Sequence, residues 1–289
     1  MPMPRSDLIR LFCLSLLWGG SFILVAIALQ CLPALSVVMG RVGLAAVILA
    51  LALALRGVPL PPRQAVPALL VMGLLNNAVP FTLFALAQGQ IGGGLAAIVN
   101  ATTPLWTVIV AHLATTDERL TPARLAGVAT GFAGVVVMAG RSSGGEVWAI
   151  VACLGAALSY GCASVWGRRF RAMGLLPAQT ALGQLIASSL MILPVWLLVD
   201  HPWALPFPGW GPLAAVGVLA AASTAFAYLL FFRILAGSGA VAISLVTFLI
   251  PVSAVAMGVA FLGESLLPRH LAGMALIAAG LWFLQRRRA

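Results

Sequence analysis

The sequence predicts an all-α membrane protein with ten transmembrane helices, arranged as two inverted five-helix repeats. Three observations lead to this prediction: a composition too apolar for water, apolar runs of membrane-spanning length, and a similarity between the two halves of the chain. Of the 289 residues, 62% are hydrophobic and only 8% are charged. A soluble domain is typically about 45–50% apolar and about 25% charged. We therefore expect lipid to surround most of this chain.

Ten apolar runs fill almost the whole length. A helix needs about 20 apolar residues to cross roughly 30 Å of hydrocarbon, and these runs are continuous rather than alternating, which argues against membrane strands. The first run is longer than the roughly 7–15-residue core of a signal peptide, so we expect it to remain as the first helix. The runs lie near residues 8–29, 34–55, 65–87, 92–114, 122–139, 147–167, 176–199, 210–232, 239–262 and 267–285.

The placement of arginine in the gaps between these runs predicts the orientation. All sixteen basic residues are arginine. With the N-terminus inside, thirteen face the cytoplasm, Arg141 and Arg269 face outside, and Arg41 lies within the second run. Cytoplasmic loops collect basic residues, so we expect a multi-pass protein of the bacterial inner membrane with both termini in the cytoplasm. The net charge of +10 then reflects orientation rather than nucleic-acid binding.

The two halves of the chain, residues 1–140 and 141–289, are similar to each other. Residues 84–104 align without gaps on residues 231–251. This alignment keeps glycine and proline in order, which chance agreement between apolar sequences would not favour. We therefore predict two five-helix repeats as the structural units of the chain.

The arginine content of the gaps indicates that the repeats are inverted, as an odd number of helices per half requires. The gap between the first and second helices has no arginine, whereas its counterpart holds Arg168, Arg169 and Arg171. The gap between the second and third helices holds Arg56 and Arg63, and its counterpart has none. Inverted repeats are common in secondary transporters, whose substrate site lies near the midplane between the repeats.

Several short motifs follow one another along the chain, and one of them occurs twice. They are Trp18-Gly19-Gly20-Ser21-Phe22, Arg41, the series Pro104, Glu118, Gly127 and the matching series Pro251, Glu264, Gly273. In this order they resemble the drug/metabolite transporter superfamily, in its branch of ten-helix EamA-type exporters. The resemblance spans essentially the whole chain and implies export of amino acids and related metabolites. One departure is that the second half has no arginine equivalent to Arg41, although Gln184 lies nearby.

The third predicted helix and its repeat counterpart each carry a face of polar and aromatic side chains. Spacings of three and four residues place side chains on one helical face, and polar groups at membrane depth are costly unless they face protein or water. Two such walls would suit an amphipathic substrate; hydrogen-bonded packing between helices is the alternative. The equivalent residues are Asn77, Phe81, Phe84 and Gln88 in the first half and Thr224, Tyr228, Phe231 and Leu235 in the second.

Other helices add candidates to this site. Prolines at matching places in the fourth and ninth helices remove a backbone donor and kink the helix, which indicates either paired gates or ordinary structural kinks. Arg41 either attracts a carboxylate at the outer mouth or extends to the surface. The candidate substrate-binding residues are Trp18, Asn77, Phe81, Phe84, Asn100, Tyr160, Thr224, Tyr228 and Ser244, and the candidate gating residues are Pro104 and Pro251.

No acidic residue falls near the middle of a predicted helix. Proton relays and sodium sites in membranes usually need one, so we expect facilitative transport. The histidines are scattered, the cysteines form no CxxC pair, and catalytic motifs are missing, so we expect no enzyme, no cofactor and no metal site. The acidic residues are Asp7, Asp117, Glu118, Glu146, Asp200 and Glu264.

Together these observations predict a monomeric transporter that exports small amphipathic metabolites by alternating access. Amino acids, including aromatic or other apolar ones, are the expected substrates, and the bilayer is the other expected partner. A broad drug exporter or a lipid flippase of the same superfamily is the alternative.

Overall fold

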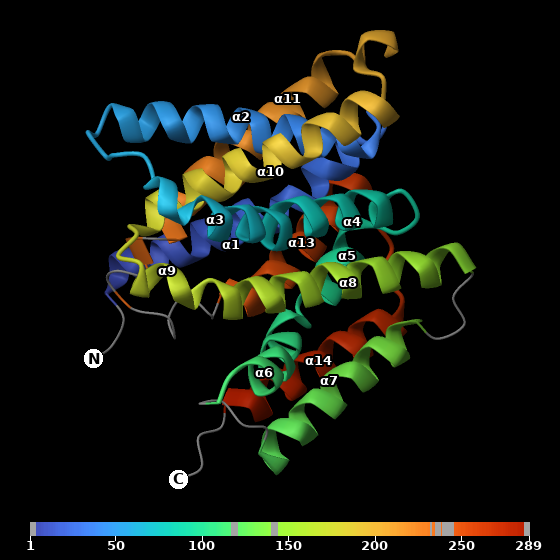
Figure 1. Ribbon diagram of the computed structural model, residues 1–289. Coiled ribbons are helices and arrows are strands. Elements are labelled where there is room, and N and C mark those ends of the chain that lie inside the picture. Colours follow the sequence, from blue (N-terminus) through green and yellow to red (C-terminus); the bar gives the residue numbers. More distant parts are fainter. Residues whose placement is uncertain are drawn as a thin grey trace.

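A computed structural model of the chain describes residues 4–116, 121–139, 144–231, 233–234, 238 and 246–285. Within these ranges every regular element is a helix and no strand occurs (Figure 1). The all-α architecture expected from the composition is thereby confirmed.

The helices follow the predicted apolar runs closely. The first half contains α1 (Arg5–Ala28), α2 (Ala34–Ala54), η1 (Arg63–Ala65), α3 (Val66–Gly73), η2 (Leu74–Ala78), α4 (Val79–Gln88), α5 (Gly93–Asn100), α6 (Thr103–Ala114) and α7 (Pro122–Ala139). The second half contains α8 (Gly144–Trp166), α9 (Arg168–Ala172), α10 (Pro177–Val199), η3 (Pro202–Ala204), α11 (Trp210–Ala220), η4 (Ala221–Phe226), α13 (Val246–Leu262) and α14 (Pro268–Gln285).

Proline and glycine mark where several helices begin and end. Pro122, Pro177 and Pro268 are the first residues of α7, α10 and α14, where a missing backbone N–H costs nothing. Gly57 and Gly263 follow the last turns of α2 and α13 with a φ of 64° each. This left-handed conformation closes a helix and favours glycine, which has no Cβ.

Eight helical segments in the described ranges are long and apolar enough to cross a membrane. They are Arg5–Ala28, Ala34–Ala54, Arg63–Gln88, Gly93–Ala114, Pro122–Ala139, Gly144–Ala172, Pro177–Val199 and Trp210–Phe231. The apolar helix α13 is shorter, at 17 residues, and α14 occupies the place of the tenth predicted run. A multi-pass membrane protein is thus supported, while the count of ten spans stays a prediction.

The outer surface of the bundle is as apolar as its interior. Large side chains on the spanning helices remain exposed, among them Leu51 at 61%, Val136 at 72% and Leu198 at 74%. In water such a surface would be unstable because apolar area drives association. Around a bundle in a bilayer, the same side chains face lipid tails.

The packing of helices follows the same pattern in both halves. α1 packs against α13 as α8 packs against α6, and α2 packs against α11 as α10 packs against α3. α1 also contacts α11, as α8 contacts α4. Each of these pairs maps onto its counterpart when the two repeats are exchanged, so the elements of one half pack mainly against those of the other.

The pair formed by α7 and α14 lies at one side of the bundle (Figure 1). Glycines let the two backbones approach closely: a Cβ on Gly134 would lie 2.6 Å from the carbonyl oxygen of Gly273, and one on Gly280 would lie 2.5 Å from that of Gly127. Small residues at a helix interface are typical of membrane proteins. Gly127 and Gly273, which belong to the duplicated motif, therefore serve this packing.

Two π-helical segments interrupt the third and eighth spans at matching places. The offset that aligns Phe84 with Phe231 also places η2 (Leu74–Ala78) on the first five residues of η4 (Ala221–Phe226). A π-turn needs a hydroxyl or another partner for the backbone carbonyls it disturbs. Ser159 Oγ donates to Leu75 O over 2.7 Å, and Thr224 Oγ1 donates to Leu219 O over 2.8 Å.

Candidate functional site

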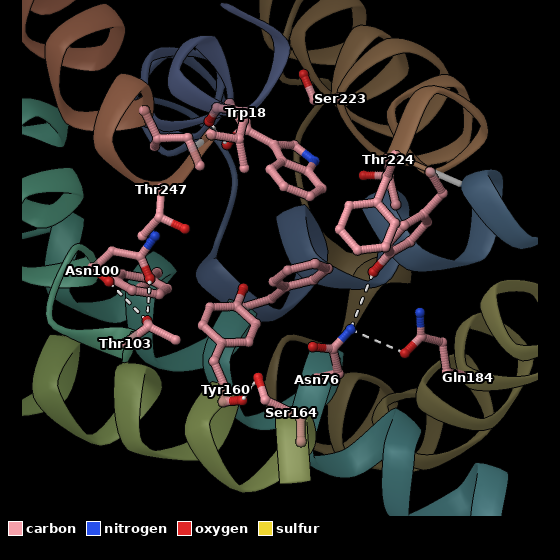
Figure 2. A pocket seen from close by; sticks show the side chains of 18 of the residues that line it. Trp18, Asn76, Asn100, Thr103, Tyr160, Ser164, Gln184, Ser223, Thr224 and Thr247 are labelled. Carbon is pink, nitrogen blue, oxygen red and sulfur yellow. Dashed lines mark hydrogen bonds between the residues drawn. The ribbon is translucent and has the colours of Figure 1, made fainter. Parts of the chain in front are cut away.

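A cavity of about 1000 Å³ lies between the two halves of the bundle, and Figure 2 shows part of its lining. This volume is at the upper end of the roughly 300–1,000 Å³ that ligand sites span. Its wall is formed by residues from α1 to α6, from α8, α9, α10 and α13, and from both π-helical segments. The cavity therefore lies where the repeats meet.

One part of the wall is aromatic. The rings of Trp18 and Phe231 lie 5.8 Å apart, those of Phe22 and Phe84 are 5.6 Å apart edge to face, and those of Phe84 and Tyr160 stack at 6.2 Å. These centroid distances are typical of favourable aromatic pairs. These rings offer apolar surface against which an apolar body can pack.

Another part of the wall is a hydrogen-bonded polar group. Asn76 Nδ2 donates to Gln184 Oε1 over 3.0 Å and to the hydroxyl of Tyr228 over 3.4 Å, as Figure 2 shows. The Tyr228 hydroxyl in turn donates to Asn77 Oδ1 over 3.2 Å. The network joins three helices and holds neutral polar atoms at the edge of the cavity.

A second polar patch lies across the cavity, where Asn100, Thr103 and Thr247 are close together (Figure 2). Thr103 Oγ1 donates to Asn100 O over 2.8 Å, and Asn100 Oδ1 lies 3.3 Å from the same hydroxyl. Here the fourth span breaks into α5 and α6 at Ala101 and Thr102. Discontinuous helices are a recurrent feature of transport sites because they present polar backbone and side-chain groups at membrane depth.

Arg41 on α2 places a charged side chain in the cavity lining. Its side chain is half-buried, Nε donates to Thr224 Oγ1 over 3.1 Å, and the guanidinium carbon lies 3.7 Å above the ring of Phe81. Arg41 therefore does not extend to the surface but lies in the cavity lining, and its place at an outer mouth stays a prediction.

The two ends of the cavity differ. At one end its lining includes the exposed residues Ser164, Arg168 and Arg171, which indicates an opening to solvent. At the other end lies Gln88, whose Oε1 is buried. The cavity is therefore open at the end where α8 meets α9.

A carboxylate joins the two halves beyond the closed end. Glu264, in the segment after α13, accepts hydrogen bonds from the backbone N–H of Gly93 over 2.7 Å and of Gly94 over 2.9 Å. These are the first residues of α5, where a negative charge is favoured by the helix dipole. A Cβ on Gly94 would lie 2.8 Å from Glu264 Oε2, so a larger residue there would displace the carboxylate. We call this the Glu264–α5 contact.

Most sequence-predicted site residues line the cavity, and three of the described ones do not. Asn77 is fully buried, and neither it nor Pro104 nor Pro251 is part of the lining. Ser244 lies outside the described residues. Those in the lining are Trp18, Phe81, Phe84, Asn100, Tyr160, Thr224 and Tyr228.

Asn76 takes the lining position that the helical spacing assigned to Asn77. The spacing assumed 3.6 residues per turn, whereas the π-turn of η2 is wider and moves the register by one residue. The two prolines also differ in their surroundings: Pro104 is the second residue of α6, next to the break in its span, and Pro251 lies inside the continuous helix α13.

Sequence reasoning also missed Ser223 and the arginines at the open end, which line the cavity. Ser223 lies in the second π-segment, which no local pattern marks. From the sequence, Arg168 and Arg171 indicated only a cytoplasmic loop. A cluster of arginines next to a spanning helix predicts orientation and gives no sign that the side chains line a cavity.

Comparisons with known proteins agree with this architecture. The model of the EamA-like transporter family matches residues 7–140 and again residues 147–286. A solved crystal structure covers 97% of this chain, and the chain 97% of it, with a TM-score of 0.68 at 21% sequence identity. At that identity the likeness concerns the fold alone.

Related sequences are found among bacterial proteins. The chain is 29% identical to "Uncharacterized inner membrane transporter YedA" of Escherichia coli strain K12, over 89% of this chain and 83% of the relative. It is 29% identical to "Protein PecM" of Dickeya dadantii, over 79% and 77%. It is 26% identical to "Probable amino-acid metabolite efflux pump" of Salmonella typhimurium, over 97% and 95%. The resemblance found in the short motifs is confirmed: the chain is a multi-pass inner-membrane transporter that belongs to the EamA-like transporter family.

Proposed function

We propose that this transporter exports small amphipathic metabolites, amino acids above all, by facilitative alternating access. The observation that supports this most is the central cavity, with an aromatic wall beside a neutral polar one. Trp18 and Phe84 offer surface to an apolar side chain, and Asn76 and Tyr228 offer hydrogen bonds to a polar head. The printed name of the Salmonella typhimurium relative, an amino-acid metabolite efflux pump, is consistent with this substrate class.

We further propose ten spans in two inverted repeats, residues 1–140 and 141–289, with both termini in the cytoplasm. The matched helix pairs and the matched π-helical segments support the repeat. In this orientation the end with Arg168 and Arg171 opens to the cytoplasm, and the Glu264–α5 contact closes the periplasmic end. If the two repeats exchanged their conformations, the cytoplasmic end would close and the periplasmic end would open.

Facilitative transport is supported by the cavity's lack of acidic groups. Among its described lining residues there is no Asp or Glu. A carrier that couples to protons needs a group that binds a proton on one side and releases it on the other. In the proposed mechanism export needs no coupled ion.

Counterflow in proteoliposomes tests this proposal. Vesicles containing the purified protein are loaded with one unlabelled amino acid and exposed to a trace of the same labelled compound. We expect transient accumulation of label for apolar and aromatic amino acids and none in protein-free vesicles. Absence of counterflow across the whole panel would contradict the proposal.

A broad drug exporter or a lipid flippase is the second candidate, and the cavity volume of about 1000 Å³ favours it because it exceeds what one amino acid fills. The same vesicles distinguish the two. Dye efflux or movement of a labelled lipid between leaflets, without amino-acid counterflow, would support the second candidate.

A further inference from the structure

The wall of the central cavity holds the positive charge of Arg41, and Arg168 and Arg171 also line its open end. No acidic residue occurs among the described lining residues. A cleft lined by one sign of charge between low-dielectric walls concentrates ions of the opposite sign. The centre of the cavity around Arg41 therefore favours an anion.

Arg41 has the geometry of a binding group rather than of a structural ion pair. Its Nε is the atom that donates to Thr224, and the ring of Phe81 covers one face of the guanidinium. Within the described ranges no Asp or Glu forms an ion pair with Arg41. Both terminal guanidinium nitrogens are thus available to a ligand, and their fork matches the two oxygens of a carboxylate.

The energetics of the membrane favour such a ligand. A charge at membrane depth is expensive unless it is paired or hydrated, and one hydrogen bond to a threonine compensates only part of this cost. A bound carboxylate would supply the missing opposite charge. The surrounding groups hold the guanidinium in place in advance, so little conformational entropy is lost when the anion binds.

We propose that the cavity selects amphipathic carboxylates of net negative charge, with the carboxylate bound to Arg41 and the apolar body packed against Trp18, Phe84 and Tyr160. The proposal rests on the proposed function and deepens it by naming the preferred charge of the substrate. An amino-acid zwitterion binds through the same carboxylate, but its ammonium group meets only neutral acceptors such as Asn76 and the positive field of the arginines. A carboxylate without an ammonium group avoids that repulsion and binds more tightly.

This charge preference also accounts for export without a coupled proton. Bacterial cytoplasm is electrically negative, so a carrier that moves one net negative charge outward is driven by the membrane potential. Each 100 mV supports a concentration ratio on the order of fiftyfold for one charge.

Four ligands with one aromatic body and different heads test the proposal: 3-phenylpropionate, L-phenylalanine, 3-phenylpropanamide and 3-phenylpropylamine. Binding to the purified protein in lipid nanodiscs is measured by calorimetry near neutral pH, because a protonated weak acid crosses vesicle membranes unaided. We expect 3-phenylpropionate to bind most tightly, roughly tenfold to a hundredfold more tightly than the amide, and 3-phenylpropylamine to bind most weakly.

Substitution of Arg41 identifies the responsible group. Arg41→Gln should abolish the preference for the carboxylate over the amide. Arg41→Lys should keep the preference and lose several-fold in affinity, because an ammonium group cannot bind both oxygens in a fork. Arg56→Gln is the matched control, because Arg56 is exposed in the loop after α2 and does not line the cavity. This variant should bind the four ligands in the same order of affinity as the wild type.

Three results would overturn the inference: tightest binding of the amine or the zwitterion, no binding of any of the four ligands, or an unchanged carboxylate preference in folded Arg41→Gln. If Arg41→Gln does not yield monodisperse protein, the Arg41→Lys variant is used for the test instead. An affinity of Arg41→Lys for 3-phenylpropionate equal to that of the wild type would then overturn the inference. The counterflow panel judges the proposed function separately, because amino-acid exchange can occur whichever head group binds best.

Discussion

Asn76 and Asn77 are adjacent and chemically identical, yet their surroundings differ. Asn76 lines the cavity, where its amide joins Gln184 and Tyr228. Asn77 is fully buried, and its amide nitrogen lies 3.4 Å from Ser188 Oγ. A buried polar group whose partner is removed costs more free energy than a partly wetted one. The two residues should therefore contribute to different properties of the protein.

We expect Asn76→Ala to weaken transport and Asn77→Ala to weaken the fold. Loss of a neutral hydrogen bond costs about 0.5–1.5 kcal/mol, so Asn76→Ala should raise the half-saturating concentration in counterflow roughly two- to tenfold while the melting temperature stays near the wild-type value. Asn77→Ala removes two buried hydrogen bonds, to the Tyr228 hydroxyl and to Ser188, and should lower the melting temperature in detergent. The opposite assignment of effects would contradict the lining position of Asn76.

The Glu264–α5 contact connects parts of the two halves that are far apart in sequence. Hydrogen bonds from backbone N–H groups to a carboxylate are stronger than neutral ones, and the first turn of α5 adds its dipole. A nearby ion pair joins Arg269 of α14 to Glu146 of α8 over 3.3 Å. The second pair lies between partly exposed side chains and should contribute little, so Glu264 is expected to dominate the closure of this end.

We expect Glu264→Ala to open the closed end of the cavity. The measurement is the rate at which a membrane-impermeant maleimide labels a single cysteine at Gln88, in a background in which the four native cysteines are replaced. Two charge-assisted hydrogen bonds are lost, each contributing about 1.5–3 kcal/mol, so labelling from the periplasmic face should rise at least roughly tenfold.

Glu146→Ala provides the matched control for this experiment. It removes a carboxylate near the same end without touching α5, and labelling at position 88 should stay at the parental rate. Equal rates in the Glu264→Ala and parental proteins would show that other contacts keep the end closed.

The bundle as a whole has an asymmetric charge distribution that predicts its orientation. The segment before α10, which includes the short helix α9, contains three arginines, Arg168, Arg169 and Arg171, whereas the segment between α10 and α11 contains none. Because α10 (Pro177–Val199) is long enough to span the membrane, these loops lie on opposite sides of it. The positive-inside rule places the arginine loop in the cytoplasm.

We expect a cysteine at Ala204 to be labelled from the periplasm of intact cells and one at Ala172 to be protected. Both positions are exposed, on η3 and α9 respectively, so protection reflects the membrane and not burial in the protein. Permeabilised cells provide the control, since both cysteines should then react. Labelling of the Ala172 variant in intact cells would reverse the proposed orientation.

We also expect that a pH gradient alone does not drive accumulation of a transported amino acid in proteoliposomes. The reason is that the described cavity lining has no acidic side chain that could carry a proton. Vesicles with an acidic or a basic interior should reach equal internal and external concentrations. Accumulation above equilibrium under either gradient would mean that a proton carrier exists, with Glu264 as the first residue to examine.

The membrane class, the family and the approximate spans follow from the sequence because they depend on quantities that are local or additive. Apolar runs of about 20 residues predict spanning helices wherever they occur, and the duplicated Pro–Glu–Gly series indicates the family without any knowledge of contacts. Seven of the nine predicted substrate-binding residues line the cavity, namely Trp18, Phe81, Phe84, Asn100, Tyr160, Thr224 and Tyr228. Aromatic and polar residues are conspicuous in an apolar chain, which explains their recovery.

Which helical faces meet in the centre depends on the tertiary structure. In a soluble protein the apolar face of a helix points inward, but here lipid is as apolar as the core, so hydrophobicity carries little information on rotation. The π-turn of η2 moved the lining position from Asn77 to Asn76, and no local pattern announces such a turn. The partner of Arg41 is Thr224, and that of Glu264 is the start of α5. Such pairs form only when helices from both halves pack together, so the composition and spacing of one chain segment do not predict them.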